Sequence, residues 1–228
     1  MSAITPQECI GLHALDFQSY QPLAQYHIPT YLDWYNNSDF DHQFAFHKKM
    51  LQYLQSGGVG GRWLLKSPVH LPHIEHLFRA YPDAAVITTH RHPVKIIASV
   101  SSLMHSVRTL YSDHADPIET GREMMEMWSD YLNTFTQQRE KLQDKSSQFV
   151  EIFFEDFIKD PVGCVQDVYS HFGWDFSPEV KSRMEQFMKD NPKDKHGKHH
   201  YTLEEFGLNE KEINKRFSDY IDFLNSKT

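Results

Sequence analysis

The run from Ala84 to Thr89 constrains the fold of this chain more than any other segment. It is continuous, apolar or β-branched, and it follows the turn sequence Tyr81-Pro82-Asp83, so it predicts a buried β-strand. Pro93 comes four residues later, at a typical first position of a helix. The residues after Pro93 repeat apolar side chains at helical spacing: Ile96, Ile97, Val100, Leu103, Met104 and Val107. The segment is therefore a strand that leads into an amphipathic helix.

Two further apolar runs predict strands, Trp63–Leu65 and Phe149–Phe154, and helical patterns lie between them. Capping signals mark several helix starts: Asp39 or Asp41, Asp116-Pro117-Ile118-Glu119, Asp160-Pro161, and Asn209 with Glu212. Nearly continuous apolar strands that alternate with helices predict an α/β fold, with a parallel sheet covered on both faces. No repeat or low-complexity linker divides the chain, so we expect one domain over residues 1–228.

Composition excludes several classes of protein. The chain has 23 Lys and Arg against 31 Asp and Glu, and this net charge of −8 argues against binding a nucleic acid polymer. No run of about 18 apolar residues is present, so we expect no membrane span. The first residues lack the basic and apolar regions of a signal peptide, and Cys9 and Cys164 form no metal or redox motif. These features favour a cytoplasmic protein, unless a signal or anchor preceded this sequence.

Ligands of parallel α/β sheets bind beyond the carboxyl ends of the strands, so the residues that follow each strand are the candidates. Lys66 and His70 follow the first predicted strand, and they suit an anionic ligand and a proton transfer. The simpler alternative is a capped helix start with an exposed lysine. Arg91 follows the second strand, where a guanidinium meets an anion near a helix N-terminus. Ser99 lies beside the apolar stripe of the next helix, where a hydroxyl either faces a cleft or belongs to a solvated flank.

Histidines number 15, and they prompt a metal-binding hypothesis. His70, His73 and His76 recur every three residues, with Glu75 beside them. On a helix the first and third of these point in directions about 120° apart, and no Cys or HExxH pattern supports a site. We therefore expect no metal. A basic segment, Lys193–Tyr201, is either a phosphate-binding loop or a solvated surface loop.

These segments together resemble the sulfotransferases that use 3′-phosphoadenosine 5′-phosphosulfate (PAPS) as donor. The resemblance rests on Trp63–Leu71, with its Leu65-Lys66-Ser67-Pro68 core, on Tyr81–Ala84 and on Thr89–Pro93 with Ser99. It extends to Glu8-Cys9, Ile28–Trp34, Asp160-Pro161 and His196–Leu208, so it covers nearly the whole chain. It implies a three-layer fold like that of P-loop NTPases. His92 stands where the family commonly has Asp or Asn, which puts the local hydrogen bonding in question.

The resemblance implies a role for seven residues. Arg91 and Ser99 match the pair that holds the 3′-phosphate of PAPS, at the family's eight-residue spacing. Lys66 would stabilise charge near the transferring sulfuryl group, and His70 would take the proton of the acceptor hydroxyl. The remaining three lie where a C-terminal loop would close over the nucleotide: Lys195, Gly197 and Lys198.

One expected element has no counterpart in the sequence. These enzymes begin with a strand, a phosphate-binding loop and a helix that cradle the 5′-phosphosulfate, and the match starts after that unit. Residues Gly57–Gly61 do not replace it, because they precede a predicted strand instead of following one. We therefore expect an N-terminally truncated sulfotransferase domain, inactive or weak alone, whose parent transfers a sulfuryl group to a hydroxyl or amine of a small-molecule or carbohydrate acceptor. The alternative is a non-catalytic remnant that binds adenosine 3′,5′-bisphosphate.

Overall fold

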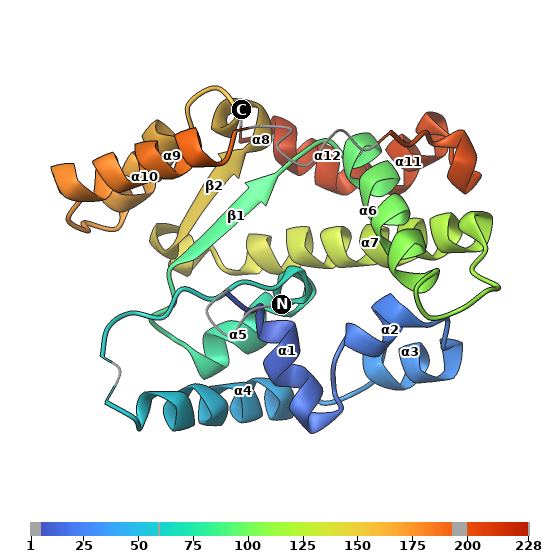
Figure 1. Cartoon of the computed structure of the whole chain (residues 1–228), viewed down its shortest axis with the longest axis horizontal. Coiled ribbons are helices and arrows are strands. Elements are labelled where there is room, and N and C mark those ends of the chain that lie inside the picture. The colour runs from blue at the N-terminus through green and yellow to red at the C-terminus, as the bar shows by residue number, and fades with distance from the viewer. Residues whose placement is uncertain (1–5, 59, 193–199, 228) are drawn as a thin grey trace.

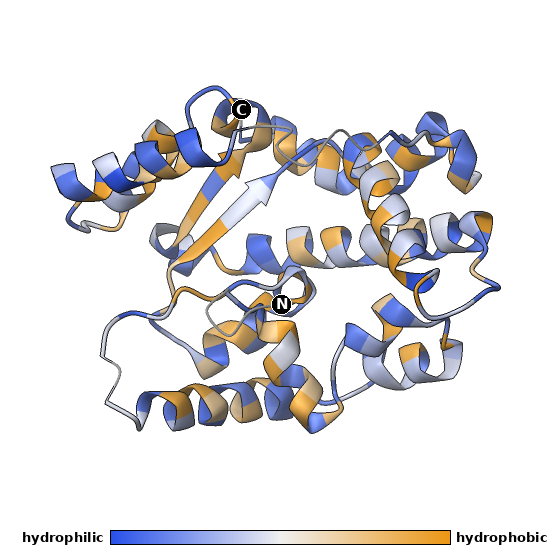
Figure 2. Cartoon of the chain, in the orientation of Figure 1, coloured by the Kyte–Doolittle hydropathy of each residue, from blue (hydrophilic) through white to orange (hydrophobic). Residues whose placement is uncertain are grey.

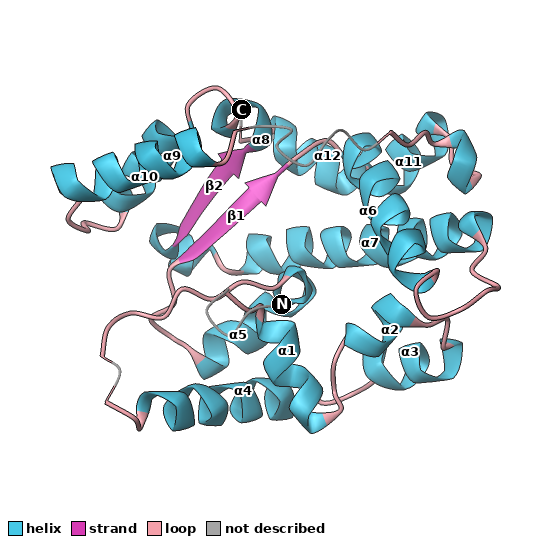
Figure 3. Ribbon diagram, viewed as in Figure 1, coloured by secondary structure: helices cyan, strands magenta, loops and turns pink. Residues whose placement is uncertain are grey.

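A computed structural model describes residues 6–58, 60–192 and 200–227. Figure 1 shows helices around a small sheet of two strands, β1 (Val86–His90) and β2 (Phe149–Phe153). The strands are parallel, and the register pairs Val86 with Phe149 and His90 with Phe153. The predicted parallel sheet is thus confirmed, within a chain that is mostly helical (Figure 3).

The α-helices are, in chain order, α1 (Cys9–His13), α2 (Gln21–Gln25), α3 (Pro29–Asn36), α4 (Phe40–Gln55), α5 (Ile74–Ala80), α6 (Pro93–Arg108), α7 (Pro117–Lys141), α8 (Phe154–Phe157), α9 (Pro161–His171), α10 (Pro178–Asp190), α11 (Glu210–Arg216) and α12 (Ser218–Asn225). Short 3₁₀ helices are η1 (Ala14–Asp16), η2 (Pro68–His73), η3 (Gln143–Gln148) and η4 (Glu204–Phe206).

The predicted helix starts are confirmed by their caps. The side chains of Asp39, Asp116, Asp160 and Asn209 each accept a hydrogen bond from a backbone N–H in the first turn of the helix that follows. Each cap satisfies donors that the helix itself leaves free. Local sequence therefore fixes where these four helices begin.

The predicted strand Trp63–Leu65 is wrong. These residues are outside any strand, and Leu64 is 91% exposed. A strand needs a hydrogen-bonded neighbour, and the sheet in the described residues contains only β1 and β2. The carbonyl of the next residue, Lys66, instead accepts a hydrogen bond from the N–H of Cys9 at 3.0 Å.

The sheet is covered on one face, and the expectation of cover on both faces is wrong for the described residues. Thr88 and His90 are buried, while Ile87 is 40% exposed and Thr89 is exposed too. Side chains alternate between the faces of a strand, so β1 has one packed face and one open face. Figure 2 shows that both strands carry hydrophobic residues.

Helix α7 organises the core because it packs on two sides. Met125, Leu132 and Phe135 belong to a cluster with β2, α6, α11 and α12. Met124, Met127 and Tyr131 belong to a second cluster, with residues of α2, α3 and α4. In Figure 1 this helix runs between the sheet above it and α1 to α5 below it. Two apolar faces on one helix join the two halves of the core.

Replacing Gly121 with Ala is expected to destabilise the protein by about 1–3 kcal/mol, because the close approach of α7 to η4 leaves no space for a methyl group. A Cβ at Gly121 would lie 2.2 Å from the carbonyl oxygen of Phe206. Gly11→Ala is the matched control, since Gly11 is also helical and has open space. Urea denaturation measures both, and equal stability of the two variants would contradict this packing argument.

Candidate functional site

The carboxyl ends of β1 and β2 bring Arg91 and Phe154 together. Because His90 and Phe153 are register partners at the end of a parallel pair, the residues that follow them leave the sheet at the same edge. The guanidinium carbon of Arg91 lies 4.3 Å from the centre of the Phe154 ring. Its Nε is buried and has no hydrogen-bond partner among the described residues. A buried guanidinium N–H without a partner suits an anionic ligand.

Helix α6 begins directly beyond Arg91. His92 is its N-cap residue without a side-chain capping bond, and Pro93 is its first residue. The partial positive charge of a helix N-terminus therefore lies near the guanidinium. Ser99 is half-buried on the same helix, about 9 Å beyond Pro93 along the axis at 1.5 Å per residue. Joint binding of one phosphate by Arg91 and Ser99 remains a prediction.

A buried polar network fixes the end of β1, and the sequence alone did not reveal it. His90 is 1% exposed; its Nε2 lies 2.7 Å from a carboxylate oxygen of Glu151, and its Nδ1 lies 2.8 Å from the Tyr220 hydroxyl. Arg139 donates from Nε to the other oxygen of Glu151 at 3.3 Å. Burial raises the pKa of Glu151, but the hydrogen bond with His90 and the positive charge of Arg139 outweigh burial, so the net pKa is lowered. The signal in the sequence is that polar residues interrupt two otherwise apolar strands: Thr88 and His90 in the first, and Glu151 in the second.

Lys66 lies in the extended segment before η2. Its side chain is 68% exposed, and its ammonium pairs with the carboxylate of Glu8. The backbone of the same segment is tied to α1 by the Cys9 N–H bond described above. The Lys66 side chain is thus accessible to solvent, but Glu8 already neutralises its charge. Its predicted role beside a sulfuryl group remains a prediction.

His70 lies on η2 in a cluster of aromatic rings. Its ring centre is 5.7 Å from that of His13, 6.0 Å from that of His47 and 5.5 Å from that of Phe44. Its Nδ1 is buried without a partner among the described residues. Burial, with smaller effects from the neighbouring histidines, lowers the pKa of His70 to about 3. The side chain is therefore neutral at pH 7, the form a proton acceptor needs, but it is a weak base here.

The three regularly spaced histidines have separate environments. His73 stacks on Phe40 with ring centres 3.5 Å apart, while Nδ1 of His76 lies 2.9 Å from a carboxylate oxygen of Asp41. Within the described residues, the group whose donor atoms lie close enough for a metal is a different one: His27, Glu119 and Glu123. The predicted nucleotide-loop residues lie outside the described residues: Lys195, Gly197 and Lys198.

Comparison with known proteins identifies the family. The model of the sulfotransferase family matches residues 1–178, so the chain belongs to the sulfotransferase family. Among curated proteins it is similar to omega-hydroxy-beta-dihydromenaquinone-9 sulfotransferase Stf3 of Mycobacterium bovis and of Mycobacterium tuberculosis. Each is 24% identical over 163 residues, which cover 70% of this chain and 40% of the relative.

Solved structures agree with this assignment. Sulfotransferase STF9 from Mycobacterium avium matches with a TM-score of 0.86 and 27% identity, and STF1 from Mycobacterium tuberculosis with 0.82 and 32%. Both matches cover 96% of this chain and 56% of the solved chain. The chain thus spans little more than half the length of these structures. None of the helices in the described part of the chain is long and apolar enough to cross a membrane.

Proposed function

We propose that this chain binds the nucleotide part of PAPS at the carboxyl end of β1 and contributes to sulfuryl transfer to an acceptor hydroxyl or amine. The observation that carries the proposal is Arg91, whose buried, unpartnered Nε lies at the shared edge of both strands and before the first turn of α6. Membership of the sulfotransferase family supports PAPS as the donor. Sulfuryl transfer, like phosphoryl transfer, depends on positioning and charge stabilisation.

Lys66 and His70 are less favourably placed for catalysis than Arg91 is for binding an anion. Lys66 is paired with Glu8, and His70 is enclosed by His13 and Phe44. Neither residue contacts Arg91 through an interaction among the described residues. We therefore propose that this chain alone transfers sulfate slowly, and that binding of adenosine 3′,5′-bisphosphate without transfer is the second candidate function.

Arg91→Ala is expected to weaken binding of adenosine 3′,5′-bisphosphate at least tenfold, because it removes a charge-assisted contact worth about 1.5–3 kcal/mol. Isothermal titration calorimetry measures the binding constant. Arg62→Ala is the matched control, since the Arg62 guanidinium also stacks on an aromatic ring, that of Trp174, at 4.0 Å. Ser99→Ala is expected to have a smaller effect in the same direction.

Two outcomes would contradict the proposal. Absence of nucleotide binding by the unaltered chain would remove both candidate functions. Equal losses in the Arg91 and Arg62 variants would place the nucleotide elsewhere. A parallel assay with labelled PAPS and a panel of alcohols and amines separates the two candidates, because only a transferase releases labelled product.

A further inference from the structure

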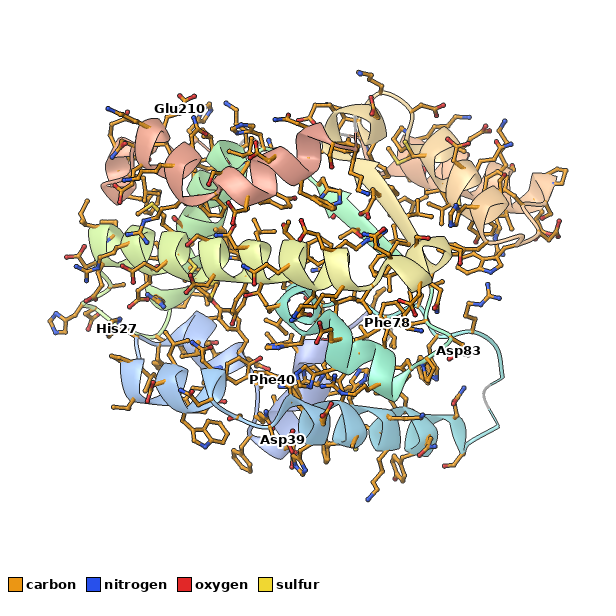
Figure 4. All side chains as sticks on the ribbon, turned by 180° about the vertical axis from the view of Figure 1, so that it is seen from behind. His27, Asp39, Phe40, Phe78, Asp83 and Glu210 are labelled. Carbon is orange, nitrogen blue, oxygen red and sulfur yellow. The ribbon has the colours of Figure 1, made fainter. Side chains whose placement is uncertain are left out.

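A wide groove lies between α7 and the segment that joins α3 to α4, on the side of α7 away from the sheet. Its volume is about 650 Å³, which is enough for a small molecule. Its aromatic lining comes from Phe40 and Tyr131, and η2 contributes Pro72 and His73. Figure 4 shows Asp39 and Phe40 at the start of α4, and His27 beside α7.

The groove is lined by negatively charged side chains. Its acidic lining residues are Asp39, Glu123, Glu126 and Asp130, and no lysine or arginine lines it among the described residues. A hollow with carboxylates on its walls concentrates a negative potential, because the protein around it is less polarisable than water. It therefore attracts cations and repels anions.

The carboxylates follow one stripe of α7. At about 100° per residue, Glu119, Glu123, Glu126 and Asp130 lie within roughly 60° of one another around the helix axis. Like charges at this spacing repel and destabilise a helix. The charge of Glu123 is neutralised by Arg108, whose Nη1 lies 2.7 Å from a carboxylate oxygen of Glu123. Glu126 and Asp130, in contrast, are exposed and form no ion pair with a described residue. A bound cation would relieve this repulsion.

Two uncharged groups in the groove also lack partners. Tyr131 is only 7% exposed, and its hydroxyl has no hydrogen-bond partner among the described residues. Nε2 of His73 is likewise buried and unpartnered. Buried polar groups are normally hydrogen-bonded, so both point to a polar ligand or ordered water at this place.

We propose that the groove binds a small molecule that carries several ammonium groups, a polyamine. Its ammonium groups lie against Glu126 and Asp130, and the aromatic side chains contact its carbon skeleton. Binding of such a ligand requires none of the residues assigned to the nucleotide.

The test is calorimetry of the full chain with spermidine as the cationic probe and citrate as the anionic one. We expect spermidine to bind and citrate not to bind. The double variant Glu126→Gln, Asp130→Asn should weaken spermidine binding about five- to tenfold, and 0.5 M NaCl should weaken it further. Glu140→Gln is the matched control, an exposed acid on the same helix outside the groove.

Three results would overturn the proposal. Equal loss in the Glu140 control would show unspecific attraction to an acidic protein, and citrate binding would show that charge does not select the ligand. Binding of Zn²⁺ that disappears in His27→Gln, without binding of spermidine, would assign the stripe to a metal at His27, Glu119 and Glu123. Nucleotide binding measured in parallel separates these outcomes from failure of the proposed function.

Discussion

Lowering the pH from 7 to 5 is expected to unfold this protein, because four buried or half-buried histidines are held in their neutral form. Burial lowers the pKa of His13, His70 and His73 to about 3 and that of His47 to about 4. In an unfolded chain the pKa of histidine is about 6.5. The stabilisation is therefore complete above about pH 6.5 and is lost as the pH falls toward the folded values.

The size of the effect follows from proton linkage. Between these pKa values each histidine contributes on the order of 1 kcal/mol per pH unit, so the four together lower the stability by several kcal/mol. A typical domain is stable by about 5–15 kcal/mol, so unfolding is expected near pH 5. Circular dichroism and tryptophan fluorescence against pH measure the midpoint.

Substitution of His13 tests whether the neutral histidines cause the acid unfolding. His13 is 1% exposed and neither ring nitrogen has a partner among the described residues, so His13→Leu removes a titrating group and two unpaired polar atoms. Its acid midpoint should move to lower pH. His114→Gln is the control, because His114 is exposed. A chain that stays folded at pH 4, or equal midpoints for both variants, would contradict the buried neutral cluster.

Glu151→Ala is expected to destabilise the protein by about 3–5 kcal/mol, because it leaves two buried basic groups without their carboxylate. The side chains of His90 and Arg139 are 1% and 7% exposed, and Glu151 contacts both. The carboxylate also joins the two strands, since Glu151 lies on β2 and contacts the ring of His90 on β1. Thermal unfolding should show a fall of about 10 °C or more in Tm.

Two further variants test this reading. Glu151→Gln keeps a hydrogen-bonding side chain without the charge and should fall between the unaltered chain and Glu151→Ala. Glu179→Ala is the control, because Glu179 pairs with Arg183 on the surface, where both side chains are about 80% exposed. A loss below 1 kcal/mol for Glu151→Ala would show that the network contributes little.

Much of the candidate site could be predicted from the sequence. Arg91 follows a strand and precedes a helix, as expected, because an apolar β-branched run and a proline at the first helical position are local signals. The strand Phe149–Phe153 and the capped helix starts were predictable for the same reason. The network of His90, Glu151 and Arg139 was not, since its members are up to 61 residues apart and meet only through strand pairing and the packing of α7.

The sequence by itself determined the elements whose signals are local: the two paired strands, the capped helices and the arginine between β1 and α6. The tertiary structure alone decided the rest. Trp63–Leu65 has the composition of a strand but no neighbouring strand among the described residues, and a strand exists only through its partner. His70 has the position of an exposed base, but packing of α1 and α4 around η2 encloses it, and burial then sets its protonation.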